Sequence, residues 1–187
     1  MPSLLAGAIA SGISGQLTAF QSIATITVGA GGSAGPLTFS SIPSTWTHLQ
    51  VRWLCRGTDA AYTNQSMAFR INSDSSTSYT YHTLYGSGSS VSATGATGYT
   101  YAYFDSIAGS ATSSGVFGVG VIDLLEYKNT NKNKTIRSLG GFDSNGTGFA
   151  QMDSMLWLST AAITRLDFYP ITGNFAQYSQ IALYGVK

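Results

Sequence analysis

Three residues in the sequence have side chains that could supply a nucleophile and a base: the single cysteine, Cys55, and the two histidines, His48 and His82. A cysteine nucleophile needs a base within hydrogen-bonding reach. Residues 45–57 alternate apolar and polar side chains, which predicts a β-strand, and His48 and Cys55 then lie on opposite faces of it. His82 could approach Cys55 only from another strand. We therefore expect no enzymatic activity, and a Cys55 that is buried as a small apolar residue.

Metal ligands are also sparse. Zinc needs three or four nitrogen or sulfur ligands close together, whereas the cysteine and the histidines are spread over three places in the chain. A better candidate is a run that matches the first half of an EF-hand calcium loop: Asp143, Asn145, Thr147 and Gly148. The last ligand position of that loop would be Ser154, where a bidentate glutamate is required. We therefore expect a hairpin turn here, with no metal and no cofactor.

Paired carboxylates, which glycoside hydrolases use, would have to come from only eight acidic residues. Asp123 and Glu126 are three positions apart, so a strand would place them on opposite faces. Asp143 and Asp153 could meet across a hairpin, but many β proteins offer such pairs. The carboxylates therefore give no specific indication of catalysis.

Tyrosines in two short runs are the most suggestive feature of the sequence. The runs share period-two spacing and consist of Tyr79, Tyr81 and Tyr85, followed by Tyr99, Tyr101 and Tyr103. Their amphipathic rings suit protein interfaces and stacking against sugars, and they also suit ordinary cross-strand pairs in a core. All three interpretations stay open here. The candidates for an interface are Tyr79, Tyr81, Tyr101 and Tyr103.

The strands that would position these residues follow from the same alternation. The strand at 45–57 needs a second apolar layer to cover one face, which carries Leu49, Val51, Trp53 and Cys55. Further strands are expected at 22–28, 36–40, 66–71, 79–85, 99–103, 116–127, 136–142, 149–158, 163–169 and 178–186. Residues 86–98 are rich in Gly, Ser and Thr and are expected to form a long loop. Since no β–α–β spacing is present, residues 21–187 predict one all-β domain, an antiparallel β-sandwich or jelly roll.

The expected strand at 116–127 is apolar on both of its faces. A strand of this kind must be covered on both sides. One face belongs to the core of the sandwich, so the other is expected to contact a neighbouring segment or subunit. We name Val116 and Ile122 as interface candidates.

Residues 1–20 differ from the rest of the chain and are expected to form an extended N-terminal arm. Four apolar residues recur there at every fourth position, Leu5, Ile9, Ile13 and Leu17. The spacing is typical of a helix, but the glycines between them oppose a stable one, each by about 1 kcal/mol relative to alanine. We therefore expect an arm that becomes ordered only against a partner, with these four residues in the interface. The apolar run is shorter than the roughly 20 residues that span a bilayer.

Charged residues make up only 9% of the chain, against roughly 25% in average soluble proteins. Few charges weaken the solubility of a lone monomer, which suits a surface that partners largely cover. The net charge of +1 gives no electrostatic case for binding nucleic acid or a membrane. The one basic run fits a solvated turn, because it lacks the interleaved aromatics of nucleic-acid sites: Lys128, Lys132, Lys134 and Arg137.

Five segments, taken in order, resemble small structural proteins of tailed bacteriophages. They are FQSIATITVGAGG, LTFSSIPSTWTHLQVRW, MAFRINSDSSTSYTYHTLYG, VIDLLEYKNTNKNKTIRSLGGFD and GNFAQYSQIALYGVK. Similar modules with a closing ALYG strand occur in phage virion and tail-associated proteins, and the resemblance runs from about residue 20 to the C-terminus. It implies a jelly-roll or sandwich module that is oligomeric and has no enzymatic activity.

The resemblance leads to an expected function, a viral structural protein of the virion. In this view the chain is made in the bacterial cytoplasm and becomes a capsid cement (decoration) protein, a trimer that bridges subunits of the major capsid protein and so stabilises the phage head. The alternative is a tail fibre or receptor-binding module that recognises host-surface glycans through tyrosine and tryptophan.

Overall fold

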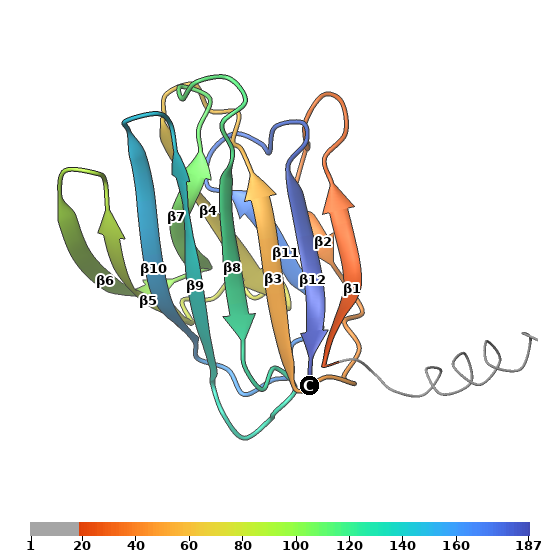
Figure 1. Ribbon diagram of the computed structural model, residues 1–187. Helices are drawn as coiled ribbons and strands as arrows, with labels where there is room; N and C mark the ends of the chain where they lie inside the picture. The colour runs from red at the N-terminus through yellow and green to blue at the C-terminus, as the bar shows by residue number, and fades with distance from the viewer. Residues whose placement is uncertain (1–18) are drawn as a thin grey trace, which may run out of the picture.

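The computed structural model describes residues 19–187, apart from the side chains of Asp105 and Ser106, and shows two antiparallel β-sheets packed face to face (Figure 1). The large sheet has the strand order β1 (Phe20–Thr27), β12 (Gln180–Val186), β3 (His48–Cys55), β8 (Gly118–Leu124), β9 (Lys134–Asp143), β10 (Gly148–Trp157), β5 (Tyr79–Gly86) and β6 (Val91–Tyr99). The small sheet lies behind it in the order β2 (Leu37–Phe39), β11 (Leu166–Pro170), β4 (Asn64–Ile71) and β7 (Ala102–Ala108). The described residues contain no helix, which confirms the all-β antiparallel sandwich. The jelly-roll topology stays a prediction.

The expected N-terminal arm falls almost wholly outside the described residues, because β1 begins at Phe20. The four apolar residues named for an interface in the arm lie in that undescribed part: Leu5, Ile9, Ile13 and Leu17. They stay a prediction.

The strand β3 lies between β12 and β8 in the large sheet, and its inward face is the one that the alternation predicts. Leu49, Val51 and Cys55 are 1%, 0% and 0% exposed, while Arg52 and Leu54 between them are exposed. The neighbouring residue Trp53 is 4% exposed and its ring packs 6.0 Å from Phe104 of the small sheet. The small sheet is therefore the second apolar layer that this strand requires.

The small sheet presents its own alternating face to the same core. Met67, Phe69 and Ile71 of β4 are fully buried, and the Phe69 ring lies 5.1 Å from the ring of Phe168 on β11. Burial of such side chains stabilises the fold by about 25 cal/mol for each Å² of apolar surface removed from water. The core therefore sits between the sheets and is built mainly from period-two strand positions.

The predicted loop at 86–98 is wrong over most of its length, because β6 occupies Val91–Tyr99. This strand forms a hairpin with β5, closed by a turn in which the Ser87 N–H donates to the Ser90 carbonyl oxygen at 3.1 Å. Gly88, at φ +90°, supplies the left-handed conformation that the turn needs. Both faces of β6 are largely open to solvent, so no apolar alternation marks it in the sequence.

The apolar segment at 116–127 becomes the strand β8 only from Gly118 to Leu124. Ile122 and Leu124 face the core and are 0% and 1% exposed, whereas Val119 on the opposite face is 53% exposed. The expectation of two apolar faces is therefore correct. The inner one belongs to the sandwich, and the outer one is left open within residues 19–187.

Candidate functional site

The structure keeps the three nucleophile and base candidates apart. Cys55 is completely buried, and burial raises the pKa of its thiol. His48 lies on the opposite strand face, where its Nδ1 accepts a hydrogen bond from the Glu126 N–H at 2.9 Å. His82 is exposed on β5, four strands away from β3 in the order of the sheet. The prediction that His48 and Cys55 lie on opposite faces of one strand is therefore confirmed.

The run that resembles half of a calcium loop is a hairpin turn, as expected. Asn145 and Gly146 occupy its two central positions with φ of 53° and 103°, and the Ser144 N–H donates to the Thr147 carbonyl oxygen at 2.7 Å. Two positive φ angles on an Asn-Gly pair identify a type I′ turn, which matches the twist of the flanking strands. One oxygen of the Asp143 carboxylate accepts the Asn145 N–H. Within residues 19–187, no group of three or more His, Cys, Asp or Glu side chains could hold a metal ion.

Neither pair of carboxylates forms a catalytic arrangement. Asp153 is buried on the inner face of β10, where it accepts hydrogen bonds from Ser138 and from Gln151, each at 2.6 Å. Asp143 lies beside the turn of the same hairpin, whereas Asp153 lies midway along it. Asp123 pairs with Arg137 on the outer face of the large sheet, and Glu126 lies beyond the end of β8. These acids stabilise separate parts of the fold.

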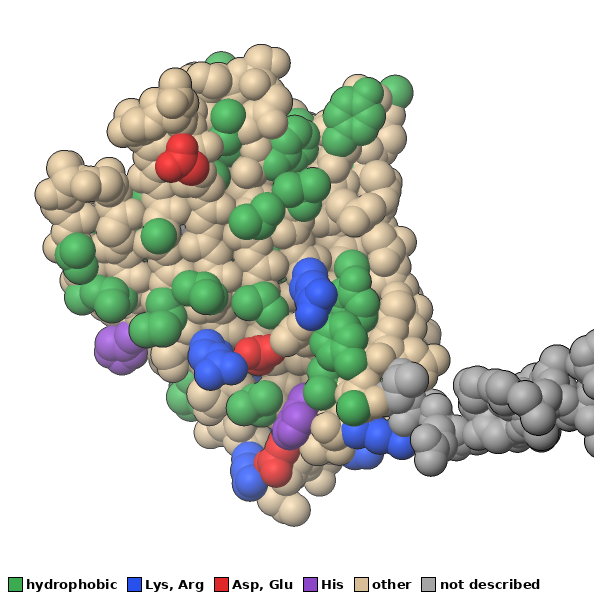
Figure 2. All heavy atoms as spheres, viewed as in Figure 1, with side chains coloured by type: hydrophobic (Ala, Val, Ile, Leu, Met, Phe, Trp, Pro, Cys, Tyr) green, Lys and Arg blue, Asp and Glu red, His purple; other side chains and the backbone are tan. Residues whose placement is uncertain are grey.

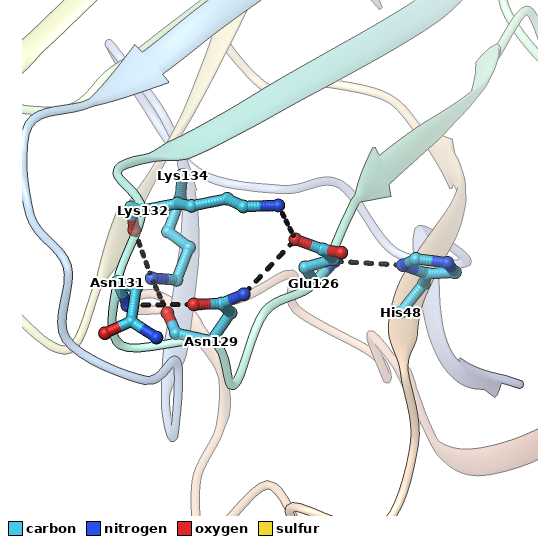
Figure 3. A network of polar contacts seen from close by, with 6 residues as sticks. All are labelled: His48, Glu126, Asn129, Asn131, Lys132 and Lys134. Atoms are coloured by element: carbon cyan, nitrogen blue, oxygen red, sulfur yellow. Dashed lines mark hydrogen bonds and ion pairs between the residues drawn. The ribbon is translucent and has the colours of Figure 1, made fainter.

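The basic run is folded into a polar network around Glu126 (Figure 3). Lys132 Nζ lies 2.6 Å from the Glu126 carboxylate, and this partner lowers the pKa of that carboxyl group. Lys134 is 2% exposed, and its ammonium group donates to three carbonyl oxygens, those of Asn129, Lys132 and Thr160. Burial lowers the pKa of Lys134. These two ammonium groups are committed to holding the turn, which agrees with the interpretation of this run as a turn.

The tyrosine runs divide between the core and the surface. Tyr79 and Tyr81 are 1% and 8% exposed, and the Tyr79 hydroxyl accepts the Ile71 N–H at 3.0 Å. Burial raises the pKa of Tyr79. As interface candidates these two residues are wrong, because the inward face of β5 places them under the small sheet. Tyr101 and Tyr103 are half-buried and form a ring cluster with Tyr99 and Tyr81.

Of the two interface candidates on the two-sided segment, Ile122 must be corrected, whereas Val116 stays a prediction. Ile122 is fully buried in the core, so it cannot touch a partner. Val116 precedes β8 and is only partly exposed, and its carbonyl oxygen accepts the Arg56 guanidinium at 2.7 Å. The sequence indicates two apolar faces, but it does not say which one turns inward. The open face carries the alternate residues, Val119 and Val121.

The outer face of the large sheet is the most distinctive surface of the described chain. An apolar row crosses five neighbouring strands in direct register, from Val121 through Leu139, Met152 and Leu84 to Ala93. We call these five residues the outer stripe. Leu139, Met152 and Leu84 are 58%, 50% and 46% exposed. Figure 2 views this face and shows apolar side chains spread across it, with few charged ones.

The face is hollowed on both sides of the outer stripe. One hollow, of about 680 Å³, lies over Leu84, Met152 and Leu125, and a second, of about 960 Å³, lies over Leu139, Val119 and a glycine-rich stretch of β9. Gly141 and Ala150 continue the second hollow, where side chains are absent or small. Large exposed apolar patches in a soluble chain mark surfaces that bind other molecules.

A row of polar residues borders the outer stripe on one side. Arg137 lies 2.7 Å from Asp123, and Gln50 donates to the same carboxylate at 2.9 Å. Burial alone would raise the pKa of Asp123, but these hydrogen bonds outweigh it and lower the pKa. Arg52 stacks over the rings of Phe20 and Tyr184 at 4.8 and 5.3 Å. Arg137, Asp123 and Arg52 on this side of the outer stripe are therefore paired or stacked, whereas the stripe itself consists of apolar side chains.

The sequence contains a signal for the outer stripe that parity alone did not resolve. The segments at 136–142 and 149–158 carry apolar residues at both odd and even positions, as 116–127 does. Only the register shows that Leu139, Met152 and Val121 line up across three strands.

The described residues contain no helix that is long and apolar enough to span a membrane. No protein-family model matches the sequence, and a search of curated proteins finds no match.

Proposed function

We propose that this protein is a viral structural protein, a capsid cement (decoration) protein of a tailed bacteriophage, without enzymatic activity. It binds the head through the outer face of its large sheet and bridges neighbouring subunits of the major capsid protein. The observation that carries the proposal is the outer stripe, a row of exposed apolar side chains on a chain with 9% charged residues. The resemblance of the ordered segments to phage structural proteins supports it.

The chemistry of this face suits permanent attachment. Stable interfaces bury roughly 800 Å² on each partner, and a central apolar area inside a polar rim is their common arrangement. The outer stripe supplies the apolar centre, and the paired charges around Asp123 and Arg137 supply a rim on one side. The N-terminal arm, with Leu5, Ile9, Ile13 and Leu17, would add a second apolar contact to the capsid or to a sister subunit.

Quantitative mass spectrometry of purified virions, combined with a low-resolution map of the particle, tests the proposal. A cement protein is present in hundreds of copies and lies on the shell. A few copies at the tail would contradict the proposal.

A variant pair tests the surface directly. Leu139→Glu should abolish attachment to heads that lack the protein, because it places a charge in the apolar row. The matched control Leu158→Glu changes a residue of similar exposure, 51% against 58%, that is not part of the outer stripe. Equal attachment by both variants would show that the outer stripe is not the binding face.

The half-buried tyrosines favour a second candidate, a receptor-binding module for host-surface glycans. Tyr101 packs edge-on against Tyr169, whose ring lies 5.4 Å from the Arg70 guanidinium carbon. Aromatic rings of this kind can stack on sugars. Under this candidate the isolated chain binds a glycan array and Tyr101→Ala abolishes the binding, while Tyr178→Ala, which changes an exposed tyrosine outside the cluster, does not. Absence of glycan binding, together with a location on the shell, would exclude it.

A further inference from the structure

The two sheets have four edge strands, β1 and β6 in the large sheet and β2 and β7 in the small one. Three of them carry features that discourage pairing with another chain. An open strand edge exposes backbone N–H and C=O groups that can pair with any other strand. β2 is only three residues long. β1 has an irregularity at Ile23, where its register with β12 shifts. The register of β7 with β4 shifts as well, and the Gly57 N–H donates to the Ala108 carbonyl oxygen at the end of β7.

The fourth edge strand, β6, has none of these features along most of its length. Its ladder with β5 runs without a shift from Val91 to Thr97, and the irregularity comes only at Gly98, near the end of the strand. From Gly86 to Phe104 the sequence contains no charged residue and no proline, the residues that usually protect an edge. Most of β6 is exposed, and the hairpin projects beyond the small sheet (Figure 1).

The hairpin geometry shows which backbone groups of β6 point outward. The Ser87 N–H donates to the Ser90 carbonyl oxygen, so this pair is a hydrogen-bonded one. Residues then alternate along an antiparallel ladder, and Ser92, Thr94 and Ala96 turn their backbone groups toward β5. The residues between them turn their N–H and C=O groups to the open edge: Val91, Ala93, Gly95 and Thr97.

We propose that β6 pairs with β6 of a second copy of this chain, antiparallel and about a two-fold axis at Thr94. This register matches Ala93 with Gly95 and Val91 with Thr97, so every outward-pointing residue of the regular ladder gains a partner. Small side chains on both strands allow the close approach, and Thr94 meets its own copy, a favourable cross-strand pair. The inference does not depend on the proposed function.

The pairing joins two large sheets into one. A two-fold axis perpendicular to the sheet keeps the outer faces of both copies on the same side. The two outer stripes, each ending at Ala93, then lie on one broad face. The oligomer built by this contact is a dimer, whereas the sequence led us to expect a trimer.

Analytical ultracentrifugation of the full chain over a wide concentration range tests the pairing. The expected mass is twice the monomer mass of 19.6 kDa. Ala93→Lys should reduce it to the monomer mass, because the lysine places a charge opposite Gly95 of the second copy, in the middle of the contact. The matched control Thr25→Lys, on the exposed edge strand β1, should remain dimeric. A monomeric or trimeric wild type, or an Ala93→Lys variant that stays dimeric, would overturn the proposal.

Two further variants separate loss of pairing from loss of folding. Ala93→Pro removes only an N–H that points away from β5, so circular dichroism and thermal unfolding of the monomer should be retained while the dimer is lost. Thr94→Cys tests the register, because non-hydrogen-bonded partners lie about 4.5 Å apart at Cα, within reach of a disulfide. Mild oxidation should give a covalent dimer, since Cys55 is buried and stays unreacted. Failure of Thr94→Cys to cross-link in a protein of dimer mass would overturn the register.

Discussion

The two faces of the large sheet are built from the same strands but meet different surroundings. On the inner face, Leu49, Val51 and Ile122 are almost completely buried in the core. On the outer face, Leu139 and Met152 keep half or more of their surface exposed. A sheet with one solvated side normally alternates apolar with polar residues. The outer face therefore carries apolar side chains that the small sheet does not cover.

The largest expected effect is on the inner face, at Trp53. Trp53→Ala should lower the free energy of unfolding by about 3–5 kcal/mol, because it removes a buried indole and leaves a cavity beside Phe104. Urea denaturation measures the change. The control is Leu54→Ala, one residue along the strand and 42% exposed, which should have a much smaller effect. Similar losses for both variants would show that the inner and outer faces of β3 do not differ as described.

A second effect on the inner face concerns the space beneath the same indole. A Cβ atom added to Gly140 would lie 2.6 Å from Trp53 Cζ2 and 3.0 Å from the Val119 carbonyl oxygen. Gly140→Ala should therefore lower the free energy of unfolding by about 1–3 kcal/mol, as overpacked cores do. The control Gly29→Ala meets no atom within 4 Å and should be close to neutral.

A double variant connects this strain to the tryptophan. In a Trp53→Leu background the smaller side chain frees the space, so Gly140→Ala should cost clearly less there than in the wild type. Equal costs in both backgrounds would show that the strain comes from the backbone and not from the indole.

These inner-face positions also show how far the sequence could predict the structure. Parity alone predicted the burial of Leu49, Val51 and Cys55, because a half-buried strand imposes period two on its side chains. Parity could not tell which apolar side of 116–127 turns inward, so Ile122 was assigned to the wrong surface. That choice depends on the small sheet, which is assembled from segments far apart in the chain.

The strand β6 was missed for a different reason. Its residues are small, and both of its sides are open, so pairing with β5 holds it in place without any apolar pattern. Long-range contacts were missed as well. The hydrogen bond from the Trp157 indole N–H to the Asp74 carboxylate joins residues 83 positions apart, and local spacing contains no information about it. The outer stripe needed the register of five strands, which only the folded chain supplies.

A third comparison concerns two acid groups with different partners, Asp74 in the turn between β4 and β5 and Asp123 on the outer face of the large sheet. Burial alone would raise the pKa of Asp74. Hydrogen bonds from Ser76, Ser78 and Trp157 outweigh it, so the pKa is lowered. The pKa of Asp123, on the outer face, is also lowered, in part by Arg137, whose side chain is 69% exposed. A carboxyl group with a lowered pKa stabilises the fold above its unfolded pKa of about 4. That contribution is lost as the pH falls through the folded value.

Salt should separate the two groups. The partners of Asp74 are neutral, so the loss of stability in Asp74→Asn at pH 7 should persist at high ionic strength. The smaller loss in Asp123→Asn should shrink, because salt screens an exposed ion pair. Thermal unfolding at pH 7 and below pH 4, in low and high salt, measures both, and each difference from the wild type should diminish at acid pH. A salt-sensitive Asp74 would contradict the assignment of its neutral partners.

The smallest expected effect on stability is at the centre of the outer stripe. Leu139→Ala should change the free energy of unfolding by no more than about 0.5 kcal/mol, because exposed substitutions away from special features rarely do more. The leucine is 58% exposed, so it gives up little packing within its own chain. Urea denaturation measures this change. Under the proposed function, the same variant should also weaken attachment to the phage head. A loss above 2 kcal/mol would mean that Leu139 packs within its own chain, and the outer face would then be part of the fold and not a surface kept for a partner.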